Sequence, residues 1–105
     1  MSLKKQFLKS KPVCKVTFRL TKEQAKSADK VNLVGDFNDW DKEAIEMTKL
    51  KSGDFSVVVS LESGQSYQFR YLLNESEWEN DWDADDYVPS SIGDSDNSVV
   101  TCQAA

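Results

Sequence analysis

The sequence of 105 residues contains no histidine, and this absence weakens any enzymatic interpretation. Histidine is the side chain that most often transfers protons near neutral pH. Neither cysteine stands in a recognisable nucleophilic context. The carboxylates are numerous but lie mainly in one loop, where solvation is their ordinary role. We therefore expect a protein that is not an enzyme and that has no cofactor.

An excess of positive charge and a long apolar run are also missing. The 13 basic and 18 acidic side chains give a net charge of -5, which would repel the phosphates of a nucleic acid or of an anionic membrane. No apolar run approaches the roughly 20 residues that a membrane-spanning helix needs, and the segment before Pro12 lacks the apolar stretch of a secretory signal. These features predict a soluble, cytoplasmic protein that binds neither nucleic acid nor membrane.

Cysteine is scarce, since only Cys14 and Cys102 are present. They stand near opposite ends of the sequence, but the first and last strands of a sandwich can be neighbours, so a disulfide is geometrically conceivable. A reducing cytoplasm would keep both thiols free. Cys14 falls on the apolar side of an alternating segment, which is typical of a small core residue.

What the sequence does contain is a series of short segments in which apolar and polar side chains alternate, as expected for half-buried strands. Several such strands separated by turns predict one all-β domain with the architecture of a β-sandwich. Thr21 and Gln24 have the spacing of a helix capping box, which predicts a short connecting helix that extends towards Ala28. The predicted strands are residues 12–20, 31–35, 55–61, 67–73 and 98–102.

An acidic segment follows the fourth of these strands and begins like a calcium-binding loop, with Asp81, Asp83 and Asp85 at alternate positions. The pattern then fails, because Asp86 stands where the loop requires glycine and Ile92 where it requires a bidentate glutamate. We therefore expect a solvated acidic loop and no metal site.

Two tryptophans stand among polar residues, outside the alternating segments that are expected to form the core. Trp40 ends a tight turn that follows the strand at 31–35, and Trp78 follows the strand at 67–73, on which Arg70 alternates away from the core. A flat indole suits the C–H face of a pyranose ring, and a guanidinium can bind its hydroxyl groups. The pattern therefore suggests sugar recognition.

Other interpretations of these residues stay open. Either Trp40 or Trp78 could instead be a structural lid over the end of the sandwich, because large aromatic residues are highly buried on average. Arg70 could be a plain surface residue paired with Glu77 or Glu79. We expect Phe37 to be a core plug beneath the turn and Trp82 to be structural.

The order and spacing of these residues resemble carbohydrate-binding module family 48. The resemblance covers roughly residues 13–100, and its most specific element is Gly35-Asp36-Phe37-Asn38-Asp39-Trp40. The family includes the glycogen-binding domain of the AMP-activated protein kinase beta subunit, the early-set domain of isoamylases and glucan branching enzymes, and small free-standing bacterial early-set proteins. The resemblance implies an immunoglobulin-like sandwich that binds α-1,4-linked glucans on an exposed sheet face.

The resemblance also implies the residues that bind the sugar. Trp40 and Trp78 match the platform tryptophans, Arg70 matches a hydrogen-bonding lysine, Ile92 a protruding aliphatic residue, and Asn97 an asparagine that contacts hydroxyl groups. The chain departs from the family at Asp94, where the kinase domain has a hydroxyl residue; an ionised aspartate can only accept hydrogen bonds. A second departure is Trp82, which replaces the proline of an Asp-Pro turn. The predicted carbohydrate-binding residues are therefore Trp40, Arg70, Trp78, Ile92, Asp94 and Asn97.

The sequence thus predicts a non-catalytic module for glycogen, starch or maltooligosaccharides that acts alone or brings a glycogen-metabolism enzyme to its substrate. An alternative is an early-set interaction domain that uses the aromatic face for a protein partner or a homodimer and binds no sugar. In either case we expect a single domain over residues 12–102, an N-terminal extension over 1–11 and a C-terminal tail over 103–105.

Overall fold

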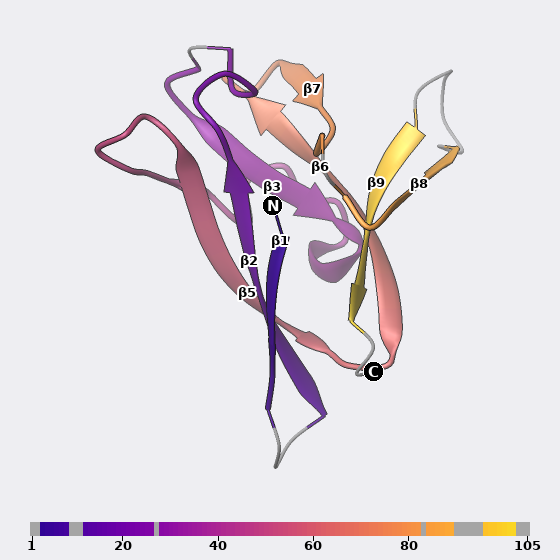
Figure 1. Cartoon of the computed structure of the whole chain (residues 1–105). Coiled ribbons are helices and arrows are strands. Elements are labelled where there is room, and N and C mark those ends of the chain that lie inside the picture. The colour runs from indigo at the N-terminus through magenta and orange to yellow at the C-terminus, as the bar shows by residue number, and fades with distance from the viewer. Residues whose placement is uncertain (1–2, 9–11, 27, 83, 90–95, 103–105) are drawn as a thin grey trace.

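The computed structural model describes residues 3–8, 12–26, 28–82, 84–89 and 96–102, and these form two antiparallel sheets packed face to face (Figure 1). The four-stranded sheet has the order β1-β2-β5-β4, and the five-stranded sheet has the order β3-β6-β9-β8, with β7 also paired to β6. The predicted all-β, immunoglobulin-like sandwich is confirmed. The strands are β1 (Leu3–Phe7), β2 (Val13–Leu20), β3 (Val31–Gly35), β4 (Thr48–Lys49), β5 (Phe55–Glu62), β6 (Gln65–Leu73), β7 (Glu77–Glu79), β8 (Asp86–Pro89) and β9 (Asp96–Cys102).

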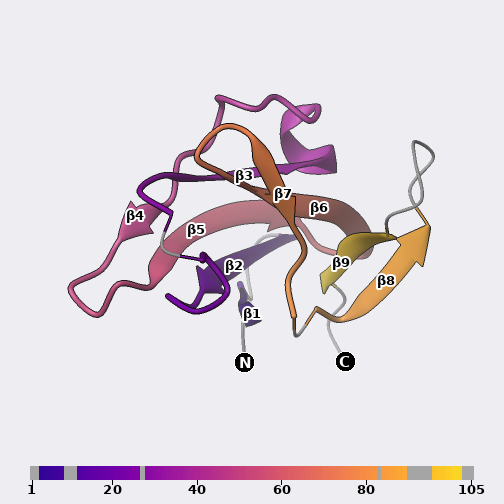
Figure 2. The same cartoon turned by 90° about the horizontal axis from the view of Figure 1, so that it is seen from above.

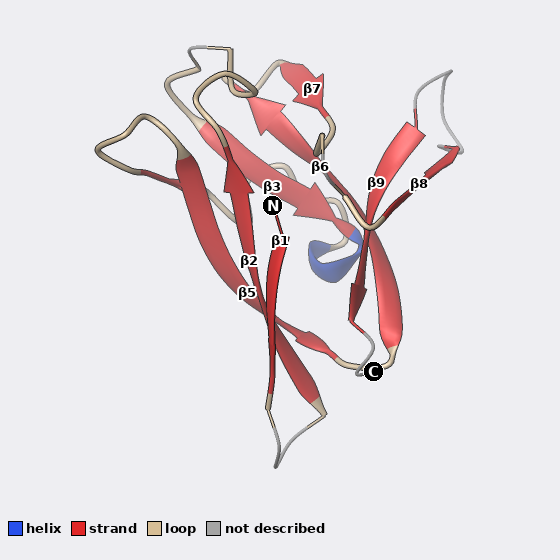
Figure 3. Ribbon diagram, viewed as in Figure 1, coloured by secondary structure: helices blue, strands red, loops and turns tan. Residues whose placement is uncertain are grey.

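Helical structure is confined to one short element in the described part of the chain. This is the 3-10 helix η1 (Asp36–Asn38), which stands out in blue in Figure 3. None of the described helices has the length and apolarity needed to cross a membrane.

The first strand comes from a segment that we expected to be an N-terminal extension. β1 pairs along its length with β2, and Leu3, opposite Phe18, is buried. The sequence gives little sign of this strand because lysine and glutamine separate its two apolar residues. An edge strand needs only backbone pairing along one side, so a weak side-chain pattern is enough.

The predicted connecting helix between β2 and β3 is wrong, because residues 22–26 form turns and no helix. The capping box does form, because Thr21 N donates to Gln24 Oε1 at 3.0 Å and Gln24 N donates to Thr21 Oγ1 at 3.2 Å. Lys26 then adopts a φ of 51°, in the left-handed region, which ends the turn. Ala25 and Ala28 are buried in the core, so the packing of this segment against the sheets outweighs its helix propensity.

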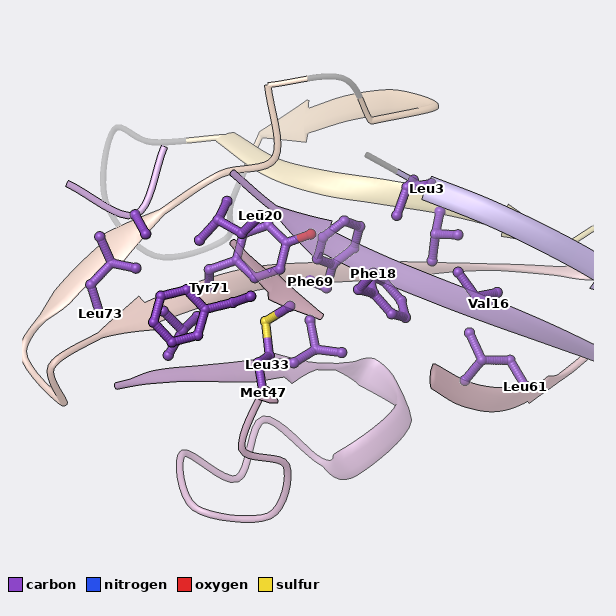
Figure 4. Close-up of a cluster of buried hydrophobic side chains, with 14 of the residues drawn as sticks. Leu3, Val16, Phe18, Leu20, Leu33, Met47, Leu61, Phe69, Tyr71 and Leu73 are labelled. Atoms are coloured by element: carbon purple, nitrogen blue, oxygen red, sulfur yellow. The ribbon is translucent and has the colours of Figure 1, made fainter. Parts of the chain in front are cut away.

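The core lies between the two sheets and is rich in aromatic side chains (Figure 4). Phe69 packs edge-on against Phe18 and Tyr71, with ring centroids 5.1 and 5.6 Å apart. Phe37 lies 5.7 Å from Phe18 and is partly buried, which confirms the core plug predicted beneath the turn.

Both cysteines are free and fully buried in this core, at neighbouring ends of β2 and β9. Burial, together with the hydrogen bond to the Cys14 thiol, raises the pKa of Cys102 to about 12. A thiol with so high a pKa forms little of the reactive thiolate.

The connection from η1 to β4 passes from one sheet to the other. It first adds to the free edge of β3, where Leu33 N donates to Ile45 O at 2.9 Å and Met47 N donates to Val31 O at 2.8 Å. The chain then joins the four-stranded sheet as β4. Figure 2 shows this connection rising beside β3, on the side away from β2 and β5. It therefore stands next to the outer face of the five-stranded sheet.

Candidate functional site

The candidate site is built on the outer face of the five-stranded sheet, which is the face turned away from the core. Phe69 and Tyr71 of β6 point into the core, so Gln68, Arg70 and Leu72 point outwards by the alternation of a strand. The pairing of neighbouring strands extends this face on both sides of β6. We call the resulting set the outer face; its members are Asn32, Val34, Gln68, Arg70, Leu72, Trp78, Asn97 and Val99.

The apolar members of the outer face are buried even though they do not belong to the main core. Val34, Leu72 and Val99 are 0, 3 and 6% exposed, and the core cluster does not include them. Larger side chains and the neighbouring connections must therefore cover them. The outer face is a second, smaller packed layer that carries polar groups and aromatic rings on top.

Trp40 stands on the turn after β3, beside this layer. Gly35 allows the close approach of β3 to β6, since a Cβ here would lie 2.5 Å from the Gln68 carbonyl oxygen and 2.8 Å from Phe69 Cβ. Asn38 then fastens the turn, because its Oδ1 accepts from Gly35 N at 3.1 Å and its Nδ2 donates to Leu33 O at 3.0 Å. Trp40 N donates to Gly35 O at 2.9 Å.

Asp36 fixes the indole of Trp40 through its side chain. Trp40 Nε1 donates to Asp36 Oδ1 at 2.9 Å, and the backbone N–H of Gln68 donates to Asp36 Oδ2 at 2.8 Å. The carboxylate thus caps β6 where its pairing with β3 ends. Sequence analysis did not single out Asp36, although it lies inside the Gly35–Trp40 motif, because a strand-capping role depends on where β6 passes.

Trp78 lies on β7 opposite Leu72 and remains 38% exposed. Lys42 comes from the η1–β4 connection, and its Nζ lies over the Trp78 ring, 5.7 Å from the ring centroid. Trp40, in contrast, is half-buried. Neither indole belongs to the main core cluster, and the half-buried Trp40 fits a lid over the end of the sandwich as well as a platform.

Arg70 is half-buried and bound to other members of the outer face. Its Nε donates to Asn97 Oδ1 at 2.6 Å, and Asn97 Nδ2 donates to Gln68 Oε1 at 2.9 Å. The alternative pairing with Glu77 or Glu79 is wrong, because Lys26 contacts both of those carboxylates at 3.1 Å.

Two polar atoms of the outer face are buried without a hydrogen-bond partner, Arg70 Nη2 and Asn32 Oδ1. The guanidinium is thus not the freely projecting fork that the sequence suggested. One of its donors is already used by Asn97, and another lacks a partner.

The remaining predicted site residues have different outcomes. Asn97 joins the network with Arg70, whereas Ile92 and Asp94 lie outside the described residues. Trp82, which we expected to be structural, is 59% exposed.

The acidic segment is only in part the solvated loop that we expected: Asp85 and Asp86 are exposed, Asp83 lies outside the described residues, and Asp81 differs from the expectation. Asp81 is fully buried; its Oδ2 accepts from Tyr71 Oη at 2.7 Å, and its backbone N donates to Ser98 Oγ at 2.9 Å. Burial, and then the neighbouring Asp81 charge, raises the pKa of Tyr71 well above its usual value. Asp85 forms an ion pair with Lys5 at 2.5 Å. These carboxylates anchor the segment, since their partners come from other strands.

Among the described residues, no group of three or more histidine, cysteine or acidic side chains is placed to hold a metal ion. The outer face, with Trp40 on the adjoining turn, instead offers flat indole rings near an amide and guanidinium network, which suits a neutral polyhydroxylated ligand. A search of curated proteins found no match. The family model of carbohydrate-binding module 48, described as the isoamylase N-terminal domain, matches residues 12–88, which is more than half of the chain. The chain therefore belongs to the carbohydrate-binding module 48 family.

Proposed function

We propose that this carbohydrate-binding module binds α-1,4-linked glucans such as glycogen, starch and maltooligosaccharides, and that it does so without catalysis. The observation that supports the proposal is that both tryptophans are linked to one strand, β6. Trp40 is tied through Asp36 to Gln68, and Trp78 lies opposite Leu72 of the same strand. These two positions on β6 are about 13 Å apart at the usual rise of a strand. A glucan would lie along β6 and contact both rings.

The polar groups between the rings would bind the hydroxyl groups of the sugar. Arg70 and Asn97 lie in this interval and are already oriented by their mutual hydrogen bond. Arg70 Nη2 is buried, so the guanidinium would have to shift for this donor to reach a ligand. Ile92 and Asp94 remain predicted contacts.

The net charge of -5 favours a neutral glucan over an acidic polysaccharide. The absence of histidine from the sequence supports a non-catalytic role. Chemistry on the bound polymer would then belong to a separate enzyme of glycogen metabolism, which we place with this protein in the cytoplasm.

The affinity should be modest. Two stacked rings at roughly 1 kcal/mol each beyond area burial, with a few hydrogen bonds, correspond to dissociation constants of about 10⁻⁵ to 10⁻³ M. Long glucans should bind more tightly, because one chain can engage several modules.

Titration with maltoheptaose or β-cyclodextrin, followed by tryptophan fluorescence, tests the proposal. We expect saturable binding that Trp40→Ala and Trp78→Ala each weaken strongly. Trp82→Ala is the matched control, since it removes an exposed indole from the β7–β8 connection and should leave the affinity unchanged. Absence of any response at millimolar sugar, or full binding by the Trp40 and Trp78 variants, would contradict the proposal.

A second candidate function is a protein-interaction or homodimerisation domain. The exposed rings of Trp82 (59%) and Tyr87 (42%) favour it, because exposed aromatic residues are enriched at protein interfaces. A molecular size that rises with protein concentration, together with no response to sugar, would support this alternative.

A further inference from the structure

Lys42 holds a position on the outer face that the proposed function does not explain. Its backbone is fixed on both sides, because Asp41 N donates to Asn38 O at 3.1 Å and Glu43 N donates to Asp41 Oδ1 at 2.9 Å. Further along, Ile45 O accepts from Leu33 N of β3. The side chain extends from this anchored segment, and its ammonium lies 5.7 Å from the centroid of the Trp78 ring.

This contact uses the surface on which a sugar would stack. A pyranose packs its C–H groups against the face of an indole, and a cation above the ring occupies the same place. Trp78 is still 38% exposed, so the cation–π contact is open to water and weak. Because the backbone around Lys42 is anchored, movement of this one side chain is enough to uncover the ring.

We propose that Lys42 covers Trp78 in the free protein and competes with the glucan for the same face of the indole, so that it lowers the affinity of the site. This inference rests on the proposed function and adds a residue that regulates it. The two platforms then differ: Trp40 donates a hydrogen bond to Asp36, whereas Lys42 must leave Trp78 before a sugar can bind there.

Lys42→Met tests this proposal, because methionine keeps an unbranched side chain and removes the charge. Lys49→Met is the matched control, since Lys49 Nζ lies 5.8 Å from the Phe55 ring centroid in a similar contact on the four-stranded sheet. In maltoheptaose titrations, we expect Lys42→Met to bind about two- to five-fold more tightly than the unmodified protein, the size expected for an exposed cation–π contact. Lys49→Met should bind with unchanged affinity.

A second measurement does not depend on sugar. With Trp40→Phe and Trp82→Phe, Trp78 is the one remaining indole, and its emission should shift when Lys42 is changed to methionine but not when Lys49 is. Equal or weaker glucan binding by Lys42→Met, while the unmodified protein binds, would overturn the competition and leave the proposed function intact. An unmodified protein that binds no glucan would overturn both, and an unchanged Trp78 emission would show that the ammonium does not cover the ring.

Discussion

Substitution of Asp36 tests both the stability of the fold and the affinity of the candidate site, because its carboxylate contacts a strand and a platform tryptophan. Its two oxygens accept from Trp40 Nε1 at 2.9 Å and from Gln68 N at 2.8 Å. In Asp36→Asn the amide keeps one acceptor oxygen, but its NH₂ group would face an N–H donor. One of the two hydrogen bonds must therefore be lost.

The expected magnitudes follow from the exposure of this residue. Hydrogen bonds to charged groups are worth about 1.5–3 kcal/mol, and since Asp36 is exposed we expect a loss of about 1 kcal/mol. For a domain of this size the unfolding midpoint would fall by about 4–8 °C. A released Trp40 indole must also be ordered again on binding, at about 0.5–1.5 kcal/mol, so glucan affinity should fall about two- to ten-fold.

Thermal unfolding and maltoheptaose titration measure the two effects, and Asp39→Asn is the matched control. It removes the same charge three residues away, and asparagine tolerates the left-handed backbone of Asp39, whose φ is 55°. If Asp36→Asn and Asp39→Asn lowered stability and affinity equally, the loss of charge alone would explain both effects. The proposed role of the Asp36 hydrogen bonds would then be refuted.

Three further predictions concern stability. Gly35→Ala should destabilise the protein by about 1–3 kcal/mol in urea unfolding, because its Cβ would clash with backbone. Gly64→Ala should lower the free energy of unfolding by less, since the new Cβ meets nothing within 4 Å and only the φ of +85° is unfavourable. A larger loss in Gly64→Ala than in Gly35→Ala would contradict the packing argument. The raised pKa of Tyr71 means that the unfolded state loses its phenolic proton first, so stability should fall as the pH rises above about 10. Tyr71→Phe should flatten this alkaline decline, and an equally steep decline in the variant would assign it to other groups. Asn32→Leu should raise the free energy of unfolding by about 1 kcal/mol, because it removes a buried oxygen without a partner; calorimetry that shows a loss would contradict this.

The strands that the sequence predicted are those in which alternation is strong. β2 and β6 each have one face in the core, and a period of two follows directly from their burial. β1 escaped prediction because Leu3 is its only side chain buried in the core, so the strand carries little alternation. The buried carboxylate of Asp81 escaped as well, because its burial depends on Tyr71 and Ser98, which are distant in sequence.

The sequence allowed us to predict which residues form the candidate site, but not which partners they contact. Alternation alone places Arg70 outside the core, yet its partner Asn97 comes from β9, 27 positions away. Lys42 could not be found from sequence, because its contact with Trp78 joins an irregular connection to a strand beyond β6. Contacts of this kind depend on the order of strands in the sheet, and the local pattern carries no information about that order.

The arrangement of β6 explains how one small domain can hold both a core and a binding face. Its outward residues each meet a different element: Gln68 meets Asp36 of η1, Arg70 meets Asn97 of β9, and Leu72 lies opposite Trp78 of β7. The inward residues between them, Phe69 and Tyr71, pack in the core. Because neighbouring residues face opposite sides, changes on the outer face leave the core packing in place. Ligand contacts at the exposed members of the outer face can therefore change without loss of the fold, whereas its buried members, such as Val34 and Leu72, also contribute to stability.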